Sequence, residues 1–355
     1  KLLGRPVLIE ATANQVNQYG GYTGMVPKDF YKMVLEMAEK IGVPENQMIL
    51  AGDHLGPLTW QNLPEKEAMD KSIELVYEYA RAGFTKIHLD TSMKVADDPE
   101  GLLSTETIAR RGAILYKSAM KGYEELKAEK PDAMRPVFVI GSEVPIPGGA
   151  QEAEDTLAVT SPDAFRDTVA TYRRVFKEEG IEDGMNDVIA VVVQPGVEFG
   201  DDQVFLYDHD AAVDLCAALK EYPEVCFEGH SADYQSPQSL RNMCQDGIAI
   251  LKVGPALTYG LREALFALSF MEKELVPEAE LSSNDLLIDL ARIGLGVAFV
   301  PDYCVPDDSD ELFIVETRES LPQRELAVVY NDKLPVSPAV TEFLTYFNEL
   351  PDQKL

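Results

Sequence analysis

Two histidines stand at the ends of apolar runs, where their side chains could bind a metal ion. His54 and the preceding Asp53 end the run that begins at residue 48, and His230 follows residues 225–229. An acid beside a histidine can supply both a proton carrier and a metal ligand to one pocket. In parallel α/β proteins, chemistry gathers just beyond the C-terminal ends of strands. We therefore expect a metal site with His54 and His230 among its ligands and Asp53 as the proton carrier beside it, with an ordinary polar loop as the alternative for the Asp-His pair.

Polar side chains end the other apolar runs as well. Glu143 and Gln194 each follow such a run, and carboxylate together with neutral imidazole suits zinc, manganese or a similar divalent ion. Asp90 and Ser92 could hold substrate hydroxyls, although an acid and a serine after a strand also form ordinary helix caps. Lys252 could form a Schiff base with a ketose, or bind a phosphate or hydroxyl group instead.

The other two histidines are expected to be structural. His88 lies inside an apolar run, where a buried and hydrogen-bonded histidine is the better interpretation. His209 lies between two aspartates in a polar turn and is expected to be solvated. We assign neither of them a catalytic role.

Composition narrows the class of protein. The net charge of −30 argues against a nucleic-acid partner, because phosphate backbones are bound by clustered Lys and Arg. The four cysteines lack a C-x-x-C spacing, which favours a reducing compartment over a disulfide framework. No apolar stretch approaches about 20 residues, so we expect no membrane partner and predict a cytoplasmic protein. No convincing dinucleotide motif is present, and no NAD is expected.

Short β-rich runs alternate with amphipathic segments from residue 7 to about residue 273, which is typical of a parallel sheet with crossover helices. Strands are predicted near residues 7–11, 48–52, 86–90, 137–142, 188–194, 225–229 and 249–253. Pro27 begins a helix, Gly83 ends the next, and Ser161 precedes another. Seven strands are one short of a (β/α)8 barrel. A doubly wound nucleotide fold is the weaker alternative, because the first βα turn lacks a glycine fingerprint.

Long motifs between about residues 5 and 275 closely resemble those of the GatZ/KbaZ family. They are IEATANQVNQYGGYTGM (residues 9–25), GDHLGP (52–57), GSEVP (141–145), QPGVEF (194–199) and HSADYQ (230–235). The family is described as the non-catalytic subunit of tagatose-1,6-bisphosphate aldolase, and relatives of it are reported as epimerases that interconvert fructose and tagatose, or their 6-phosphates. The resemblance implies a TIM (β/α)8-type barrel. The family has another strand and helix before this segment, so the first βα unit is expected to be missing.

The family also resembles the metal-dependent class II aldolases, which implies roles for individual residues. Their Asp-His pair corresponds to Asp53 and His54, and a second metal histidine corresponds to His230. A third would fall near Gln194, where this sequence has none, so we expect Glu143 or Gln194 to complete the site. The expected metal is zinc, with manganese, cobalt or nickel as alternatives. Substrate contacts are predicted at Asn14, Gln15, Asp90, Ser92, Gln194, Ser231 and Lys252.

The expected function is metal-dependent C4 epimerisation of a ketohexose or its 6-phosphate, fructose or tagatose, in tagatose or galactitol metabolism. The C4 hydrogen of a 2-ketose is not adjacent to the carbonyl, so we predict retro-aldol cleavage and re-addition, with the metal stabilising the enediolate. Asp53 and Glu143 are the predicted catalytic residues that move the C4 hydroxyl proton. The alternative is a non-catalytic, stabilising partner of a class II aldolase catalytic subunit. A sugar phosphate is the expected ligand, and a homo-oligomer the expected assembly.

The character of the sequence changes after residue 276, where an acidic stretch with Pro and Ser begins. We predict a barrel domain at residues 1–276 and a separate C-terminal segment at residues 277–355. Within that segment, residues 282–348 resemble the end of the effector-binding domain of LysR-type regulators, in SNDLL (283–287) and GLGVAFVPDY (294–303). No helix-turn-helix accompanies it, so we infer no regulatory activity and predict a hybrid or truncated chain.

Overall fold

The computed structural model describes residues 5–141, 157–200, 203–275 and 283–292. The chain divides into two compact units, Lys1–Ala267 and Leu268–Leu355. Glu143 and the boundary predicted near residues 276–282 lie outside the described residues, and so does most of the C-terminal segment apart from helix α8 (Asn284–Arg292). The division predicted at residue 276 and the resemblance to LysR-type regulators therefore stay predictions.

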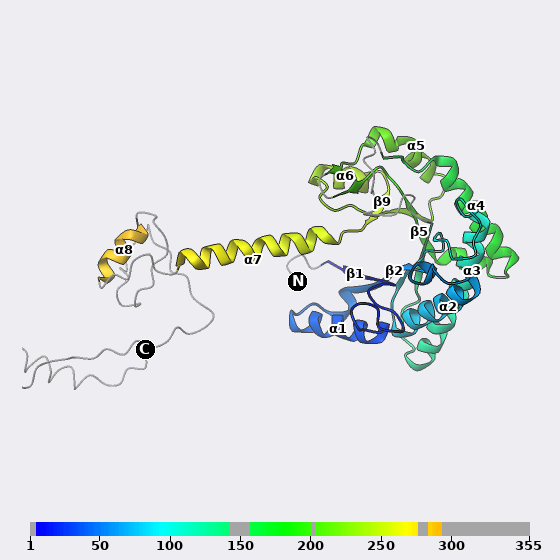
Figure 1. Ribbon diagram of the computed structural model, residues 1–355, viewed down its shortest axis with the longest axis horizontal. Coiled ribbons are helices and arrows are strands. Elements are labelled where there is room, and N and C mark those ends of the chain that lie inside the picture. The colour runs from blue at the N-terminus through cyan, green and yellow to red at the C-terminus, as the bar shows by residue number, and fades with distance from the viewer. Residues whose placement is uncertain (1–4, 142–156, 201–202, 276–282, 293–355) are drawn as a thin grey trace, which may run out of the picture. The chain divides into compact units, whose positions relative to one another are not determined.

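Seven parallel strands form one sheet in which the order in space follows the order in sequence. They are β1 (Val7–Thr12), β2 (Met48–Leu55), β3 (Lys86–Leu89), β4 (Val137–Gly141), β5 (Val188–Val193), β8 (Cys226–Gly229) and β9 (Ile248–Leu251). The order contains no reversal, whereas a doubly wound sheet reverses at its switch point. Figure 1 shows the sheet curving, as the strands of a barrel do. The predicted TIM-type fold is confirmed, and each predicted strand is present.

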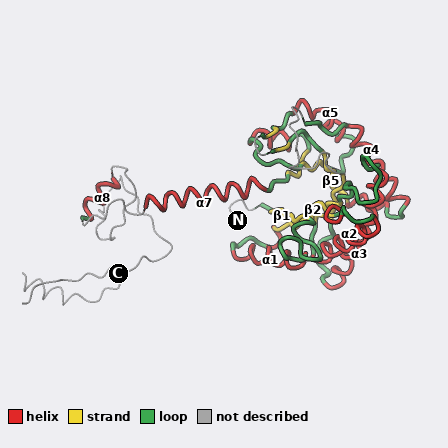
Figure 2. The backbone as a smooth tube through the Cα atoms, in the orientation of Figure 1, coloured by secondary structure: helices red, strands yellow, loops and turns green. Residues whose placement is uncertain are grey.

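Helices connect successive strands and lie outside the curved sheet, as Figure 2 shows. They are α1 (Pro27–Lys40), α2 (Glu65–Ala82), α3 (Thr105–Glu129), α4 (Pro162–Glu178), α5 (His209–Leu219) and α6 (Pro237–Gln245). Helix α7 (Pro255–Leu275) follows the last strand, β9. Local sequence sets the ends of the helices. The Ser161 hydroxyl accepts a hydrogen bond from the backbone N–H of Ala164 and caps α4, and Gly83, with φ of 103°, ends α2 in the left-handed conformation. A short antiparallel pair, β6 (Glu198–Phe199) and β7 (Val204–Phe205), lies between β5 and α5 in the sequence.

Alternating side chains of the strands build two apolar layers. Along β4, Phe138 and Ile140 belong to the large core that packs against the helices. Val139, between them, packs instead with Ala190 and Val192 of β5 in a small cluster. Since successive side chains of a strand point to opposite faces, this small cluster lies on the inner face of the curved sheet. Two of its residues, Val139 and Val192, lie beside polar residues of the site described below.

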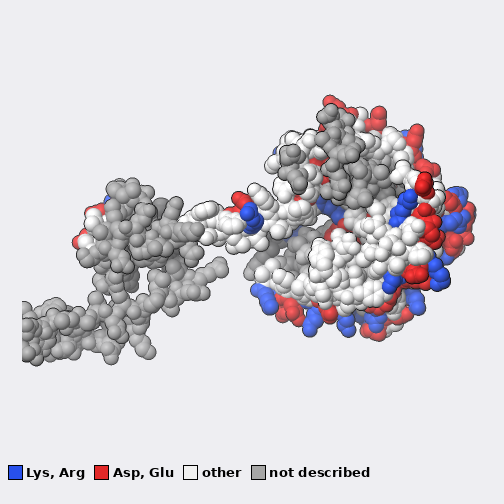
Figure 3. Space-filling model, viewed as in Figure 1, with Lys and Arg blue, Asp and Glu red and all other residues white. Residues whose placement is uncertain are grey.

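Charged residues of both signs are interspersed along the rim that the helices form, as Figure 3 shows. Ion pairs join neighbouring helices there: Arg110 of α3 contacts Glu178 of α4, and Lys117 of α3 contacts Glu179 just after α4. These pairs are solvent-exposed, so each contributes only about 0–1 kcal/mol. No helix among the described residues is both long enough and apolar enough to cross a bilayer.

Candidate metal centre

The register of the sheet places two buried polar side chains inside the barrel. His88 on β3 pairs in register with Val139 on β4, and Glu228 on β8 pairs with Val192 on β5. Val139 and Val192 point inward, and residues at the same register position share a face of the sheet, so His88 and Glu228 also point inward. Lys86 lies two residues before His88 on β3 and therefore faces the same way. The strands themselves, and not only the loops, supply polar groups to this interior.

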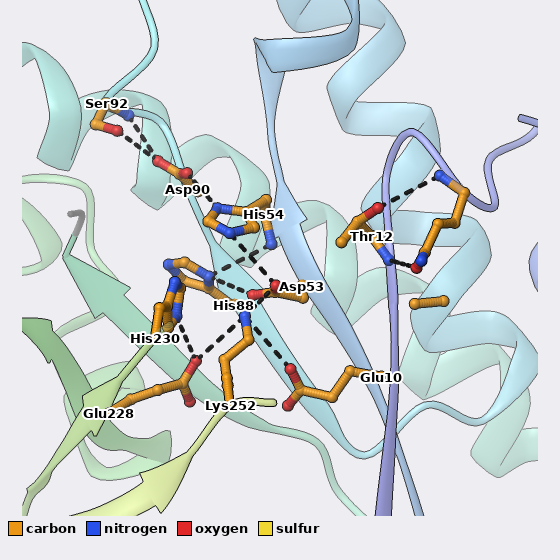
Figure 4. A network of polar contacts seen from close by, with 12 residues as sticks. Glu10, Thr12, Asp53, His54, His88, Asp90, Ser92, Glu228, His230 and Lys252 are labelled. Atoms are coloured by element: carbon orange, nitrogen blue, oxygen red, sulfur yellow. Dashed lines mark hydrogen bonds and ion pairs between the residues drawn. The ribbon is translucent and has the colours of Figure 1, made fainter. Parts of the chain in front are cut away.

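Two other histidines reach the same interior from the strand ends. His54 lies at the end of β2, and His230 directly follows β8. His54 has φ of 48° and Ser231 has φ of 51°, a left-handed conformation that is strained for residues with a Cβ atom. The ring centres of His54, His88 and His230 lie 5.0–5.6 Å apart. Figure 4 shows the three histidines grouped together, with the carboxylates of Asp53, Asp90 and Glu228 around them.

Each of the three histidines has its shortest carboxylate contact with a different residue, and His54 Nε2 also lies 3.4 Å from Asp53 Oδ2. The pairs are His54 Nδ1 with Asp90 Oδ2 at 2.9 Å, His88 Nδ1 with Asp53 Oδ1 at 2.9 Å, and His230 Nε2 with Glu228 Oε1 at 3.1 Å. A carboxylate that contacts an imidazole nitrogen restricts the orientation of the ring. The three rings are therefore held in place before any ligand binds.

Four of these residues form a group that could hold a metal ion. Asp53, His88, Glu228 and His230 are all buried, and each offers one ligand atom within 4.8 Å of the others. Two imidazoles and two carboxylates form a ligand set that suits a divalent cation such as zinc. His54, a predicted metal ligand, is not one of the four, although its ring is packed against theirs.

Two lysines lie among the carboxylates. Lys86 Nζ is 2.6 Å from Glu10 Oε1 and 2.7 Å from Glu228 Oε2. Lys252 Nζ contacts Asp53 Oδ2 and lies 3.4 Å from Glu10 Oε2 and 3.8 Å from Glu228 Oε1. Because Glu10 is on β1 and Lys252 follows β9, these contacts join the two ends of the sheet across the interior. With neutral histidines, four carboxylates (Asp90 included) and two lysines leave the group a formal charge of −2. A divalent cation would balance that charge.

The lysines and histidines keep the carboxylates ionised. Burial works to raise the pKa of Asp53, but the charge of Lys252 and the contacts with His54 and His88 outweigh it and hold the pKa well below its usual range. Burial also opposes ionisation of Glu228, yet the hydrogen bond with His230 and the charges of Lys86 and Lys252 lower its pKa to about 2.

The contacts that lower the pKa of the carboxylates raise the pKa of Lys252. Burial alone would lower the pKa of its ammonium group, but Asp53, Glu10 and Glu228 raise that pKa above its usual value. A Schiff-base lysine needs the reverse, because the unprotonated amine is the nucleophile. The Schiff-base alternative is therefore disfavoured.

Several predicted substrate contacts bond to their own surroundings. Gln194 Oε1 accepts from the N–H groups of Gly196 and Val197, Gln15 Oε1 accepts from the N–H of Thr12, Asn14 Oδ1 accepts from the hydroxyl of Thr59, and Ser92 donates to Asp90 Oδ1. Ser231 is buried directly after His230. Their roles toward a substrate stay predictions, and Glu143 lies outside the described residues.

Four residues of the site were not predicted from the sequence: His88, Glu228, Lys86 and Glu10. His88 is buried and hydrogen-bonded, as expected, but it also stands at the centre of the ligand group. The sequence did contain a signal for these residues, because each of the four is ionisable and lies in a strand that is mostly apolar. Such residues are seldom buried without a partner.

Comparison with known proteins identifies one family for this chain. The family model described as D-tagatose-1,6-bisphosphate aldolase subunit GatZ/KbaZ-like matches residues 3–291. The D-tagatose-1,6-bisphosphate aldolase subunits GatZ of Salmonella heidelberg (strain SL476) and Salmonella agona (strain SL483) are each 50% identical over 287 residues, which is 81% of this chain. The chain spans 66% of the length of these relatives. The crystal structure of a probable tagatose 6 phosphate kinase from Sinorhizobium meliloti 1021 has a TM-score of 0.67 at 43% identity, covering 81% of this chain and 68% of that one.

The expectation of a sugar-phosphate 4-epimerase is wrong. The matching family and both curated relatives carry the name of an aldolase subunit, which favours the alternative over an isomerase. The geometry gives a physical reason for the correction. Asp53 was expected to move the C4 hydroxyl proton, but Lys252 and His88 already bind its carboxylate, and these contacts lower its pKa and so make it a weaker base.

Proposed function

Because the chain belongs to the D-tagatose-1,6-bisphosphate aldolase subunit GatZ/KbaZ-like family, we propose that it is a non-catalytic subunit that binds and stabilises a catalytic class II aldolase chain. The observation that carries the proposal is the 50% identity to GatZ subunits over 287 residues. In this proposal the partner chain cleaves the C3–C4 bond of tagatose 1,6-bisphosphate, and this chain contributes a barrel surface. The sugar phosphate then binds in the partner's active site.

The polar interior supports a structural role for this barrel. Lys86 and Lys252 bind the carboxylates of Asp53 and Glu228, so these carboxylates are not free to exchange protons with a substrate. Their ion pairs connect β1, β2, β3, β8 and the residue after β9. A network of this kind holds strands together and does not need to turn over a substrate.

Helix α7 supports association with another chain. Leu257, Leu261 and Leu265 follow one another at intervals of four residues and therefore lie on one stripe of the helix. Their exposed fractions are 68%, 63% and 58%. Contiguous exposed apolar surface is typical of a site that binds another protein. The occupant that this proposal names is the catalytic aldolase chain, and a second copy of this chain is the alternative that the experiment below separates.

We further propose that Asp53, His88, Glu228 and His230 hold a divalent cation, zinc in the first instance. The ligand chemistry fits, and the formal charge of −2 on the surrounding group matches the charge of the ion. When bound, the cation would supply a strong positive charge that joins the ends of β2, β3 and β8. The residues of the chain orient one another through the carboxylate–imidazole contacts already described.

The experiment combines the purified chain with a purified class II aldolase catalytic chain that cleaves tagatose 1,6-bisphosphate. Formation of dihydroxyacetone phosphate is measured for each protein alone and for the mixture, together with the thermal unfolding of the aldolase. We expect no turnover by the chain alone. At about ten times its Kd, the chain should stabilise the aldolase by about 1.4 kcal/mol.

The double variant Leu261→Asp/Leu265→Asp tests whether α7 binds the aldolase. Leu102→Asp is the matched control, because Leu102 is 83% exposed and does not belong to α7. The α7 variant should lose the stabilising effect, and Leu102→Asp should keep it. Cleavage of the bisphosphate by the chain alone would overturn the proposal, as would a mixture in which the two chains migrate separately in size exclusion. A complex between copies of this chain that excludes the aldolase would also count against it.

A further inference from the structure

The ammonium group of Lys252 already occupies the position of a cation in the candidate metal centre. It contacts Asp53 Oδ2 and lies within 3.8 Å of both Glu228 Oε1 and Glu10 Oε2. Asp53 and Glu228 are two of the four residues of the ligand group. A divalent ion bound by these carboxylates would therefore lie close to a positive charge, and like charges at such distances repel strongly in a buried site. An ion at this site would therefore compete with Lys252 for the same two carboxylates.

The two lysines of the centre differ in their freedom to move. Lys86 is part of strand β3, its side chain is 3% exposed, and it is held between Glu10 and Glu228 at 2.6 and 2.7 Å. Lys252 follows the last residue of β9, and its side chain is 15% exposed. Lys252 is therefore the lysine that can withdraw from the ligand group without disturbing a strand.

Glu10 provides an alternative position for the withdrawn ammonium. Its Oε2 atom lies 3.4 Å from Lys252 Nζ, and Glu10 is not one of the four ligand residues. A lysine that leaves Asp53 for Glu10 keeps a counter-charge, so it does not become a buried unpaired cation. The movement needed is small compared with the reach of a lysine side chain.

We propose that Lys252 is a built-in competitor of the divalent cation, which holds Asp53 in the metal-free protein and moves to Glu10 when the cation binds. The inference rests on the proposed metal centre and adds to it a residue that sets its affinity. It predicts effects of opposite sign for two substitutions. Removing the lysine charge should strengthen cation binding, and removing the charge of Glu10 should weaken it, because Lys252 then has no other carboxylate to move to.

The experiment measures the Kd of Zn²⁺ by competition with a chromophoric chelator, on the full chain. Lys252→Met keeps most of the length of the side chain and removes the charge, and it should bind zinc about tenfold more tightly than the wild type or better. Glu10→Gln should bind about tenfold more weakly. Lys66→Met, at a lysine that is 87% exposed, is the control for the change in net charge and should leave the Kd unchanged.

Lys252→Met removes a partner from buried carboxylates and can therefore destabilise the fold. For this reason, the thermal unfolding of each variant is measured without metal alongside the zinc titrations. If that variant does not fold, Glu10→Gln carries the test by itself. Equal or weaker zinc binding by folded Lys252→Met, or unchanged binding by Glu10→Gln, overturns the inference while leaving the metal centre in place. No zinc binding by any variant overturns both. Association with the aldolase is measured separately and does not depend on either result.

Discussion

Arg111 offers the clearest test of what holds the loop after β3, which carries Ser92. Its side chain in α3 is 2% exposed, and its guanidinium donates to both oxygens of Asp98, at 2.6 and 3.0 Å, and to Glu65 Oε1 at 2.9 Å. Asp98 belongs to the loop after β3, and Glu65 begins α2. We expect Arg111→Met, which keeps the apolar length but removes the charge, to leave Asp98 without its partner.

The magnitude follows from the burial of the two partners. Glu65 is half exposed, so its bond is worth no more than about 1 kcal/mol. Asp98 is 7% exposed, and removing one member of a buried ion pair costs about 3–5 kcal/mol. We therefore expect Arg111→Met to lower the free energy of unfolding by about 3 kcal/mol. This corresponds to about 6–12 °C in Tm for a unit of this size.

The assay is urea unfolding followed by circular dichroism, at neutral and acidic pH. Burial works to raise the pKa of Asp98, but the hydrogen bonds from Arg111 and Val95 lower it. A carboxylate with a lowered pKa contributes stability above its unfolded pKa of about 3.9, and that contribution is lost as the pH falls below this value. The difference between wild type and variant should therefore shrink at acidic pH.

The neighbouring Arg110→Met is the matched control. Arg110 lies on the same helix and also bonds to carboxylates, Glu106 and Glu178, but its side chain is 47% exposed. We expect a loss of less than about 1 kcal/mol for this variant. If Arg111→Met costs no more than Arg110→Met, burial does not decide the strength of these pairs and the reasoning is refuted.

Three other substitutions test local features of the fold. Gly56→Ala would place a Cβ atom 1.7 Å from the carbonyl oxygen of Asp90, so we expect a loss of about 3 kcal/mol or more in the free energy of unfolding, measured with urea; a variant as stable as wild type would contradict this contact between the residues that follow β2 and β3. Ser161→Ala removes the cap of α4 and should lower the free energy of unfolding by about 1 kcal/mol, whereas an unchanged value would mean that the cap is dispensable. A hydrogen bond with Asp246 raises the pKa of His209. The contribution of this bond to folding stability is therefore present below the unfolded pKa of about 6.5 and is lost as the pH rises through the folded pKa. His209→Gln should destabilise the chain at pH 5.5 but not at pH 9, and NMR titration of the ring should show the raised pKa.

Much of the fold could be predicted because its signals are local. The seven apolar runs became the seven strands, and Ser161 and Gly83 set helix ends at the positions where their side chain or backbone conformation favours them. The histidines at the strand ends, His54 and His230, were found for the same reason. The prediction of an epimerase is wrong because the matching family and relatives are named as aldolase subunits. The sequence also did not reveal that Lys252 lies beside the carboxylate of Asp53.

The sequence by itself determined the parallel α/β barrel, the family and the strand ends at which polar residues gather, because periodicity, helix caps and long motifs are properties of neighbouring residues. Only the tertiary structure decided which ionisable groups meet. His88 and Glu228 join the metal-type group because the strand register points them inward, and Lys252 reaches Glu10 because the sheet curls until its two ends face each other. Those contacts join strands that are distant in the sequence. They depend on the curvature of the sheet, which no local sequence pattern encodes.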